Sequence, residues 1–427
     1  MKPLASFGIS HCRYPLSYNT HNRVGIIYIK KKACKPDEPD GLDMFGWVGA
    51  AHQSLLTWAL RAKSFHSSPL VTTRLVSNVM NKNVVGKQET KLNAREALLE
   101  AIARGRALPI GPPPTRAARR HTHPSVLGLF NGLEVEELEY CADPSAQSPS
   151  QSWVPMRLIS KPNTVSNRRR PCTILLHPTG QSKDYVAQLQ ARYAQKGYIS
   201  VAIDARYHGA REDPKLHYQD ALVRAWKEGI ERPFLLDTVW DLIRLLDYLE
   251  TREDVDPHRI GASGYSLGGM HSWFLAAADI RIAAAAPMAG VQSFAYAIAS
   301  GKFQARVDSI PRIFHAAAAD AGVTAVTREV VQSVWKRLLP GMLEGYDACA
   351  SLPVIAPRPL LVVTGEEDPR CPLPGVLVAA QRAREAYASA GAPAAMELFI
   401  QPGIGHVCTL QMLQKVEQFF DSVFMSM

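Results

Sequence analysis

A serine at the turn between a strand and a helix constrains this chain more than any other feature. The run Gly264-Tyr265-Ser266-Leu267-Gly268-Gly269 follows a segment, 256–263, that reads as a turn and a short strand. Residues 270–278 are small or apolar and contain no helix breaker, so we expect a helix to begin at the serine. The flanking glycines let the strand and the helix approach closely. The pattern predicts a strained turn that exposes one serine hydroxyl.

Two later loops carry an acid and a base in a matching order. An apolar run, 359–364, reads as a buried strand, and the loop after it holds three acids, Glu366, Glu367 and Asp368. A second run, 396–400, reads as a strand, and His406 follows it directly after Gly405. A serine hydroxyl becomes nucleophilic when a base accepts its proton and an acid orients that base. We therefore expect Ser266, His406 and an acid of the first loop to form a catalytic triad.

These motifs resemble the α/β-hydrolase superfamily, in particular its prolyl-oligopeptidase-like and dienelactone-hydrolase-like catalytic domains. The resemblance covers about residues 134–427. Besides the serine motif it rests on three segments: Asp204–Arg211, Asp237–Leu242 and Gly365–Pro372. It implies an α/β fold with a mostly parallel sheet, helices on both faces and helical cap insertions. In the Gly-x-x-Asp pattern of the family the acid is the fourth residue, which is Asp368 and not Glu366 or Glu367.

The resemblance also implies an oxyanion hole made of two backbone N–H groups. One donor is expected at Leu267, directly after the serine. The second is expected in the loop after the first core strand, which reads His177–Gly180. Pro178 replaces a glycine that is frequent in relatives, and proline has no N–H group. We therefore expect Thr179 to be the second donor, with Gly180 as the alternative.

The N-terminal part is basic and does not read as a folded domain. Residues 1–120 hold 19 lysines and arginines against 7 aspartates and glutamates, a net charge of +12, so the rest carries −3 of the total +9. Residues 1–90 are expected to be a disordered tail. The alternative is a transit peptide for a plastid or mitochondrion, because residues 44–88 contain arginine and serine but no acidic residue. That alternative requires Met44 to be the working start.

The remaining chain is expected to form two parts. Residues 91–133 read as a helical extension, with apolar residues at helical spacing over 91–106. Residues 134–427 read as the catalytic domain, and insertions near 212–232 and 291–351 are expected to form caps over its site. Four side chains are expected to line the substrate pocket: Tyr207, Met288, Trp335 and Tyr346.

Composition argues against several other classes of protein. The hydrophobic content of 47% excludes global disorder, and no uninterrupted apolar run reaches the roughly 18–20 residues of a membrane span. Seven scattered cysteines suit a reducing compartment, so we expect an intracellular protein, in the cytoplasm unless it is targeted to an organelle. The slightly acidic catalytic part offers no basic surface for nucleic acid.

No cofactor or metal is expected. His121 and His123 are closely spaced, but no further ligand cluster accompanies them, and Cys371 reads as a packing thiol near the acid. His177, His208 and His271 are expected to be structural or to line the pocket.

The sequence therefore predicts a serine hydrolase that acts on a small-molecule acyl substrate, a carboxylic ester or a thioester. A serine peptidase of the prolyl-oligopeptidase type is the first alternative, although only about 130 residues, without blade-like repeats, stand where such peptidases carry a propeller. A ligand receptor on a hydrolase scaffold is the second, because a fold does not fix a function. The oligomeric state is left open.

Overall fold

The computed structural model describes residues 93–106, 111–119, 122–162 and 169–425. The expectations for a tail or transit peptide over residues 1–90 fall outside this part of the chain, as does His121.

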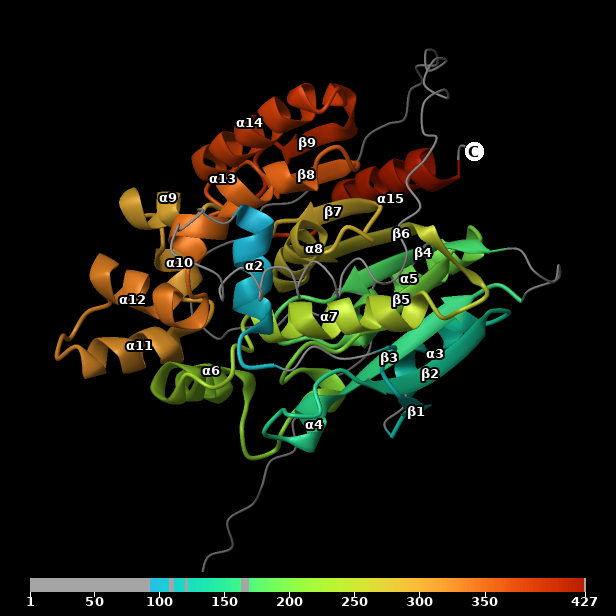
Figure 1. Cartoon of the computed structure of the whole chain (residues 1–427), viewed down its shortest axis with the longest axis horizontal. Helices are drawn as coiled ribbons and strands as arrows, with labels where there is room; N and C mark the ends of the chain where they lie inside the picture. The colour runs from blue at the N-terminus through green and yellow to red at the C-terminus, as the bar shows by residue number, and fades with distance from the viewer. Residues whose placement is uncertain (1–92, 107–110, 120–121, 163–168, 426–427) are drawn as a thin grey trace, which may run out of the picture. The chain divides into compact units, whose positions relative to one another are not determined.

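A nine-stranded sheet forms the centre of the described structure (Figure 1). Its strands lie in the order β1-β2-β3-β5-β4-β6-β7-β8-β9. The strands are β1 (Thr115–Ala117), β2 (Glu134–Cys141), β3 (Trp153–Ser160), β4 (Arg170–Leu176), β5 (Ile199–Ile203), β6 (Val255–Tyr265), β7 (Ala284–Met288), β8 (Leu360–Gly365) and β9 (Met396–Gln401). From β5 to β9 neighbouring strands pair in parallel, whereas β1, β2 and β3 pair antiparallel. The mostly parallel sheet predicted from the sequence is confirmed.

Helices cover both faces of the sheet. Successive residues of a strand point to opposite faces, so apolar residues on both faces need helices to bury them. On one face Ile174 packs in a cluster with α7 (Leu236–Leu249), α8 (Leu267–Ala278) and α14 (Leu373–Ser389). On the other face its neighbour Leu175 packs in a separate cluster with α5 (Ala187–Gln195) and α15 (Leu410–Phe424). Both layers are rich in aliphatic and aromatic side chains, and their burial stabilises the sheet by the hydrophobic effect.

One predicted boundary differs from the observed one, since the strand before the serine is longer than expected: Val255 already pairs with Arg170 of β4. Two further elements begin after a turn. A 3₁₀ turn, η2 (Lys183–Val186), precedes α5. Strand β7 begins at Ala284, since the carboxylate of Asp279 accepts a hydrogen bond from the N–H of Arg281 and holds it in a turn.

The helix expected over 91–106 is observed as α2 (Ala94–Ala103). Asn93 and Glu96 form a capping box that satisfies N–H groups of its first turn. Leu98 and Ile102 are buried in the same hydrophobic cluster as α7 and α8. Arg95 donates a hydrogen bond of 2.9 Å to the carbonyl oxygen of Ala277 in α8. The helix is therefore anchored by apolar packing and by a polar contact.

Both expected insertions are helical and contact each other. The first carries α6 (Tyr218–Glu228), between β5 and α7. The second lies between β7 and β8 and carries α9 (Phe294–Ala299), α10 (Gln304–Val307), α11 (Pro311–Asp320), α12 (Arg328–Leu338) and α13 (Ala348–Ser351). Helix α6 packs against α11 and α12. Because both segments leave the sheet at the carboxyl ends of its parallel strands, they cover the edge where α/β proteins place their sites.

The expectation that Trp335 lines a pocket is wrong. Its ring is 2% exposed and lies within 5.1–5.4 Å of the rings of Phe234, Phe294 and Phe314, centroid to centroid. Tyr346 is also fully buried, and its hydroxyl donates to the carbonyl oxygen of Pro340. These large side chains form the core of the second insertion because aromatic burial there stabilises helices that no sheet supports.

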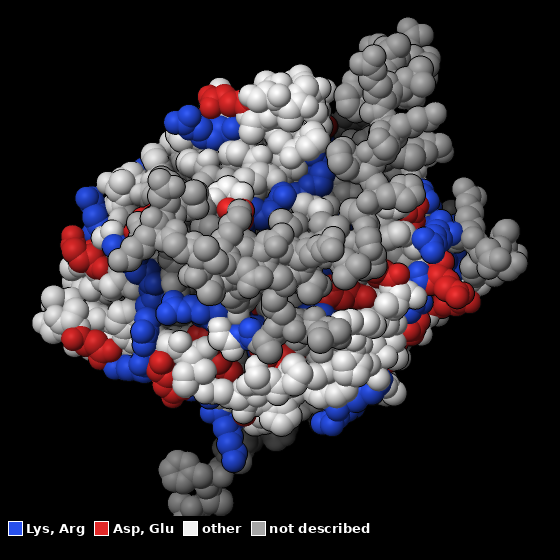
Figure 2. Space-filling view, viewed as in Figure 1, with Lys and Arg blue, Asp and Glu red and all other residues white. Residues whose placement is uncertain are grey.

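The surface carries charges of both signs. Figure 2 shows lysine and arginine side chains interspersed with aspartate and glutamate side chains on one face of the described structure. No described helix combines the length and the hydropathy that crossing a membrane requires. The expectation that the chain does not bind nucleic acid stays a prediction.

Candidate active site

Ser266 occupies the strained turn that its motif predicts. Its φ of +57° lies in the region that non-glycine residues rarely adopt, and it links the end of β6 to the start of α8. Its N–H donates a hydrogen bond of 2.9 Å to the carbonyl oxygen of Met288 in β7. A Cβ atom at Gly264 would lie 2.5 Å from the backbone of Gly268, and one at Gly268 would collide with the carbonyl oxygen of Leu176. Only glycine at these two positions lets the helix start so close to the strands.

The structure brings Ser266, His406 and Asp368 into one hydrogen-bonded series. The Oγ of Ser266 lies 2.8 Å from Nε2 of His406, and Nδ1 of His406 lies 2.8 Å from Oδ2 of Asp368. Each residue follows the carboxyl end of a parallel strand, namely β6, β9 and β8. Since these ends meet at one edge of the sheet, residues 140 and 38 positions apart in the sequence become neighbours.

The environment of His406 favours its neutral form. Burial lowers the pKa of His406 below its ordinary value, and nearby Arg306 and Arg370 lower it further, against the opposing effect of Asp368. Burial alone would raise the pKa of Asp368, but its interactions with His406 and with two backbone N–H groups lower that pKa overall. An ionised carboxylate therefore faces Nδ1–H, and Nε2 is left to accept a proton from the serine.

The two glutamates beside the acid lie elsewhere. Glu366 accepts a hydrogen bond of 3.0 Å from the N–H of Gly403, and both Glu366 and Glu367 are exposed. Asp368 is only 2% exposed. The choice of the fourth residue of the pattern as the partner of His406 agrees with this geometry.

Tyr265, which the sequence reasoning did not single out, supports the histidine loop. Its hydroxyl donates a hydrogen bond of 2.8 Å to the carbonyl oxygen of His406, and the two rings lie 5.4 Å apart. Tyr265 is the residue before the serine, so one turn presents the serine and also holds the loop that carries the histidine. Its position inside the motif was the available signal.

The two predicted oxyanion donors lie in segments that flank Ser266. Leu267 is the first residue of α8, so its N–H has no acceptor within the helix. Strands β4 and β6 pair in parallel to their carboxyl ends, which places the loop His177–Gly180 beside the serine turn. Thr179 is half-buried, whereas Gly180 is exposed with a φ of +74°. The donor roles of Leu267 and Thr179 stay predictions.

Comparison with known proteins agrees with this architecture. Residues 173–419 match the model of the Alpha/beta hydrolase family. The chain belongs to the alpha/beta hydrolase family.

Individual relatives of this hydrolase are distant. YtaP of Bacillus subtilis is 28% identical over 154 residues, which are 36% of this chain and 42% of YtaP. The match therefore spans less than half the length of that relative. Acetyl xylan esterase 1 from Thermoanaerobacterium superposes with a TM-score of 0.54 at 16% identity, covering 84% of this chain and all of that one. An acetyl xylan esterase from Paenibacillus sp. R4 gives 0.53 at 15% identity, with 82% and 98% covered. At this identity the structural likeness shows the fold.

Three histidines expected to be structural or pocket-lining are buried at the carboxyl edge of the hydrolase sheet. His177 accepts a hydrogen bond of 3.0 Å from the N–H of Ala205 at Nε2. His208 and His271 each have one ring nitrogen, Nε2, with no hydrogen-bond partner among the described residues. Burial lowers the pKa of both His208 and His271 to about 3, so both are neutral at physiological pH.

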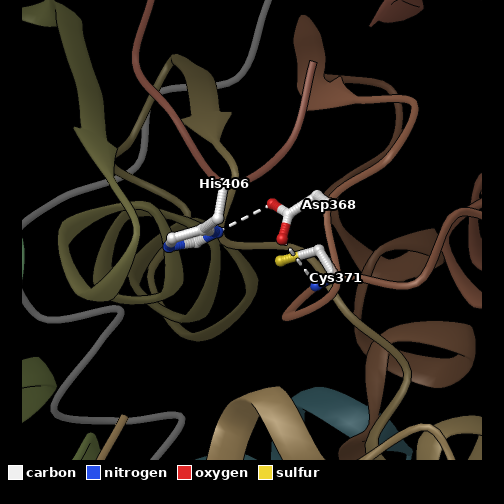
Figure 3. A group of neighbouring side chains, drawn as sticks. All are labelled: Asp368, Cys371 and His406. Atoms are coloured by element: carbon white, nitrogen blue, oxygen red, sulfur yellow. Dashed lines mark hydrogen bonds and ion pairs between the residues drawn. The ribbon is translucent and has the colours of Figure 1, made fainter. Parts of the chain in front are cut away.

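Cys371 completes a close group with the acid and the base (Figure 3). Among the described residues, Asp368, Cys371 and His406 offer possible ligand atoms within 4.8 Å of one another. However, His406 is already bonded to Asp368 and Ser266, and the thiol of Cys371 donates to the carbonyl oxygen of Ala289. Burial raises the pKa of Cys371 well above its ordinary value, which keeps the thiol protonated. The contacts fit a packing thiol better than a metal ligand.

A cavity of about 470 Å³ lies beside the acid. Its lining comes from two segments. The second insertion contributes Gly301, Lys302, Gln304 and Ala305, and the acid loop contributes Glu366, Glu367, Asp368, Pro369, Pro372, Leu373 and Pro374. The insertion therefore approaches the acid loop directly.

Proposed function

We propose that this protein is a serine hydrolase that cleaves carboxylic esters or thioesters by acyl transfer through Ser266, His406 and Asp368. The observation that carries the proposal is the continuous pair of 2.8 Å contacts from the serine hydroxyl to the histidine and from the histidine to a buried carboxylate. Membership in the alpha/beta hydrolase family supports it.

The mechanism follows from which atom of the triad donates a proton and which atom accepts it. Nε2 of His406 accepts the hydroxyl proton as Oγ of Ser266 attacks the carbonyl carbon of the substrate. Asp368 stabilises the imidazolium that forms, and it does so without accepting a proton. The N–H groups of Leu267 and Thr179 donate to the oxyanion. The imidazolium then protonates the leaving alcohol or thiol, and a water molecule, deprotonated by His406, hydrolyses the acyl-enzyme.

The neutral state of His406 suits this role. A general base must be unprotonated at the working pH, and the low pKa of His406 provides this at neutral pH. No step requires a cofactor.

Esters are proposed ahead of peptides as substrates. Two fold relatives are named as acetyl xylan esterases, so acetylated sugars are reasonable first substrates to test. Peptide hydrolysis by a prolyl-oligopeptidase-like site and ligand binding without turnover are the competing outcomes.

The test combines covalent labelling with a substrate panel. A fluorophosphonate probe should label the native protein at Ser266, and Ser266→Ala should abolish labelling and ester turnover with little change in melting temperature. Ser272→Ala is the control, since Ser272 lies in the same helix, α8, and its hydroxyl donates to the carbonyl oxygen of Gly269. Acetyl, butyryl and longer acyl esters are compared with acetylated xylo-oligosaccharides and chromogenic peptides. Native protein that resists the probe contradicts the proposal, and turnover of peptides alone favours the peptidase.

A further inference from the structure

Arg306 differs from every other buried arginine in the described residues. It lies in α10 of the second insertion and is 6% exposed. Its Nε and Nη2 are sealed from solvent and have no hydrogen-bond partner among the described residues. The other buried arginines each donate at least one hydrogen bond: Arg157, Arg206, Arg211, Arg232 and Arg244.

An unpaired buried guanidinium is costly. Arginine stays charged at physiological pH, and removing a charge from water without a counter-ion is strongly unfavourable. Burial lowers the pKa of Arg306, in keeping with that cost, and the carboxylate of Asp368, which forms no ion pair with Arg306, opposes the decrease electrostatically. A structure tolerates such a group when a ligand supplies the missing partner. The missing partner of a guanidinium is an anion, and a carboxylate matches its planar donors in a bidentate pair.

Three further buried side chains have polar atoms without a partner among the described residues: Tyr218, His208 and His271. Together with Arg306 we call them the polar layer. Arg306 is close enough to Tyr218 to lower its pKa, against the larger opposing effect of burial. The ring centroids of Tyr218 and His208 lie 4.3 Å apart. After the larger effect of burial, His177 and then His208 lower the pKa of His271. Tyr218 OH and the Nε2 atoms of both histidines are buried without partners among the described residues.

Two members of the polar layer, Arg306 and His271, connect it to the proposed catalytic residues. Gln304 and Ala305, which directly precede Arg306, line the 470 Å³ cavity together with Asp368. Arg306 also acts electrostatically on Cys371 and His406, after the larger effects of burial on the pKa of each. His271 lies in α8, which begins directly after Ser266. The unpaired groups are thus contributed by both insertions, by the loop after β5 and by the helix of the serine turn.

We propose that Arg306, assisted by the hydroxyl of Tyr218, binds a carboxylate group of the substrate next to Ser266. The inference rests on the proposed hydrolase function and names the class of substrate as an ester that bears a carboxylate. Arg306 acts here as a specificity-determining residue supplied by the cap. The carboxylate completes the hydrogen bonds that the protein leaves unmade, whereas a neutral ester leaves the guanidinium unpaired.

The test uses two matched pairs of esters. Mono-4-nitrophenyl glutarate and its methyl ester differ by a carboxylate on the acyl side, and 4-acetoxybenzoate and its methyl ester differ on the leaving-group side. The native protein should prefer the anionic member in at least one pair. Arg306→Gln should reduce the ratio of kcat/KM for the anionic ester to that for its neutral partner about 10- to 100-fold, as expected for loss of a hydrogen-bonded charge. Arg306→Lys should recover part of the ratio.

Arg312→Gln is the matched control. Arg312 lies in α11 of the same insertion, and its side chain is 58% exposed. It should leave the ratio unchanged. An equal loss for both members of each pair in folded Arg306→Gln would assign Arg306 to positioning the triad and overturn the proposal. Absence of any preference in the native protein would show that only water fills the polar layer and would also overturn it.

A binding measurement separates this proposal from the proposed function. Glutarate should raise the melting temperature of Ser266→Ala protein, while its uncharged diamide should not, and the additional change Arg306→Gln should abolish the shift. If the native protein cleaves no ester and resists the fluorophosphonate probe, the hydrolase proposal fails while this measurement still decides whether Arg306 binds carboxylates. If glutarate gives no shift and esters are cleaved without preference, the hydrolase stands and the carboxylate site does not.

Discussion

Two buried polar regions of this hydrolase differ in whether their charged side chains have partners among the described residues. In the first, three arginines meet three aspartates, and we call this set the ion network: Arg106, Arg206, Arg211, Asp143, Asp237 and Asp241. The carboxylate of Asp241 accepts three charge-assisted hydrogen bonds of 2.7–2.8 Å, two from Arg206 and one from Arg211. In the polar layer, by contrast, Arg306 has no such partner among the described residues.

The contrast separates structural charge from charge kept for a ligand. The ion network joins the helical extension, the loop after β5 and α7, since Arg106 bonds to Asp143 and Asp237 while Arg206 bonds to Asp143 and Asp241. Its three positive and three negative charges are paired inside the protein. The polar layer instead lies at the carboxyl edge of the sheet, in residues that come from both insertions, the loop after β5 and α8. Both regions are buried. They differ because the arginines of the ion network form ion pairs with aspartates of the same protein, whereas Arg306 forms none with a described residue.

The largest effect on activity is expected at a buried carboxylate of the proposed site. Asp368→Asn should reduce kcat by roughly 10⁴-fold, because the asparagine amide no longer stabilises the imidazolium or fixes the tautomer of His406. Steady-state ester kinetics checks this. Glu366→Gln is the control and should stay within about tenfold, since Glu366 contacts a backbone N–H of the histidine loop and not the ring. The reverse ranking would show that the acid is misassigned.

The matching change in the ion network should affect stability instead. Asp241→Asn should lower the free energy of unfolding by about 3–5 kcal/mol, because it leaves two buried guanidinium groups short of a counter-ion. Chemical denaturation measures the change, and turnover per folded molecule should be nearly unaffected. A mild effect on stability together with a large loss of turnover would place Asp241 in the site and break the distinction between the two regions.

The pH profile should respond to the polar layer. The value of kcat/KM should rise with pH through the pKa of His406, which lies below its ordinary value, and should stay level above it. Arg306→Gln removes a cation that helps to hold this pKa down, so the acid limb should move to higher pH. Arg312→Gln should leave it in place. A shift to lower pH in Arg306→Gln would contradict the stated electrostatics.

The smallest effect is expected at the N-terminus. Deletion of residues 1–90 should change neither the melting temperature nor ester turnover, whereas deletion through Arg106 should lower the melting temperature. The second deletion removes the buried Leu98 and Ile102 of α2 and opens the ion network at Arg106. Thermal unfolding of both proteins beside the full chain tests this. A large loss on removing only residues 1–90 would give that segment a structural role.

The fold was largely predictable because local signals agreed with one another. The apolar runs 359–364 and 396–400 predicted β8 and β9, and apolar periodicity over 91–106 predicted α2. The serine turn was predictable because glycine at positions 264 and 268 is required wherever a strand and a helix come this close. Trp335 was misplaced because an apolar stripe on a helix predicts burial but does not reveal what covers it.

The candidate site was predictable where a motif fixes both residue type and order. By itself the sequence determined the α/β alternation, the serine turn and the residues proposed as acid and base, because these depend on neighbours within a few positions and on strand ends that share one edge. Tertiary structure alone decided which buried charges have partners. Arg206 and Arg306 are indistinguishable as letters in a sequence, yet one meets the carboxylates of Asp143 and Asp241 and the other meets none among the described residues. A counter-ion is supplied by distant segments, and only folding brings them within hydrogen-bonding distance.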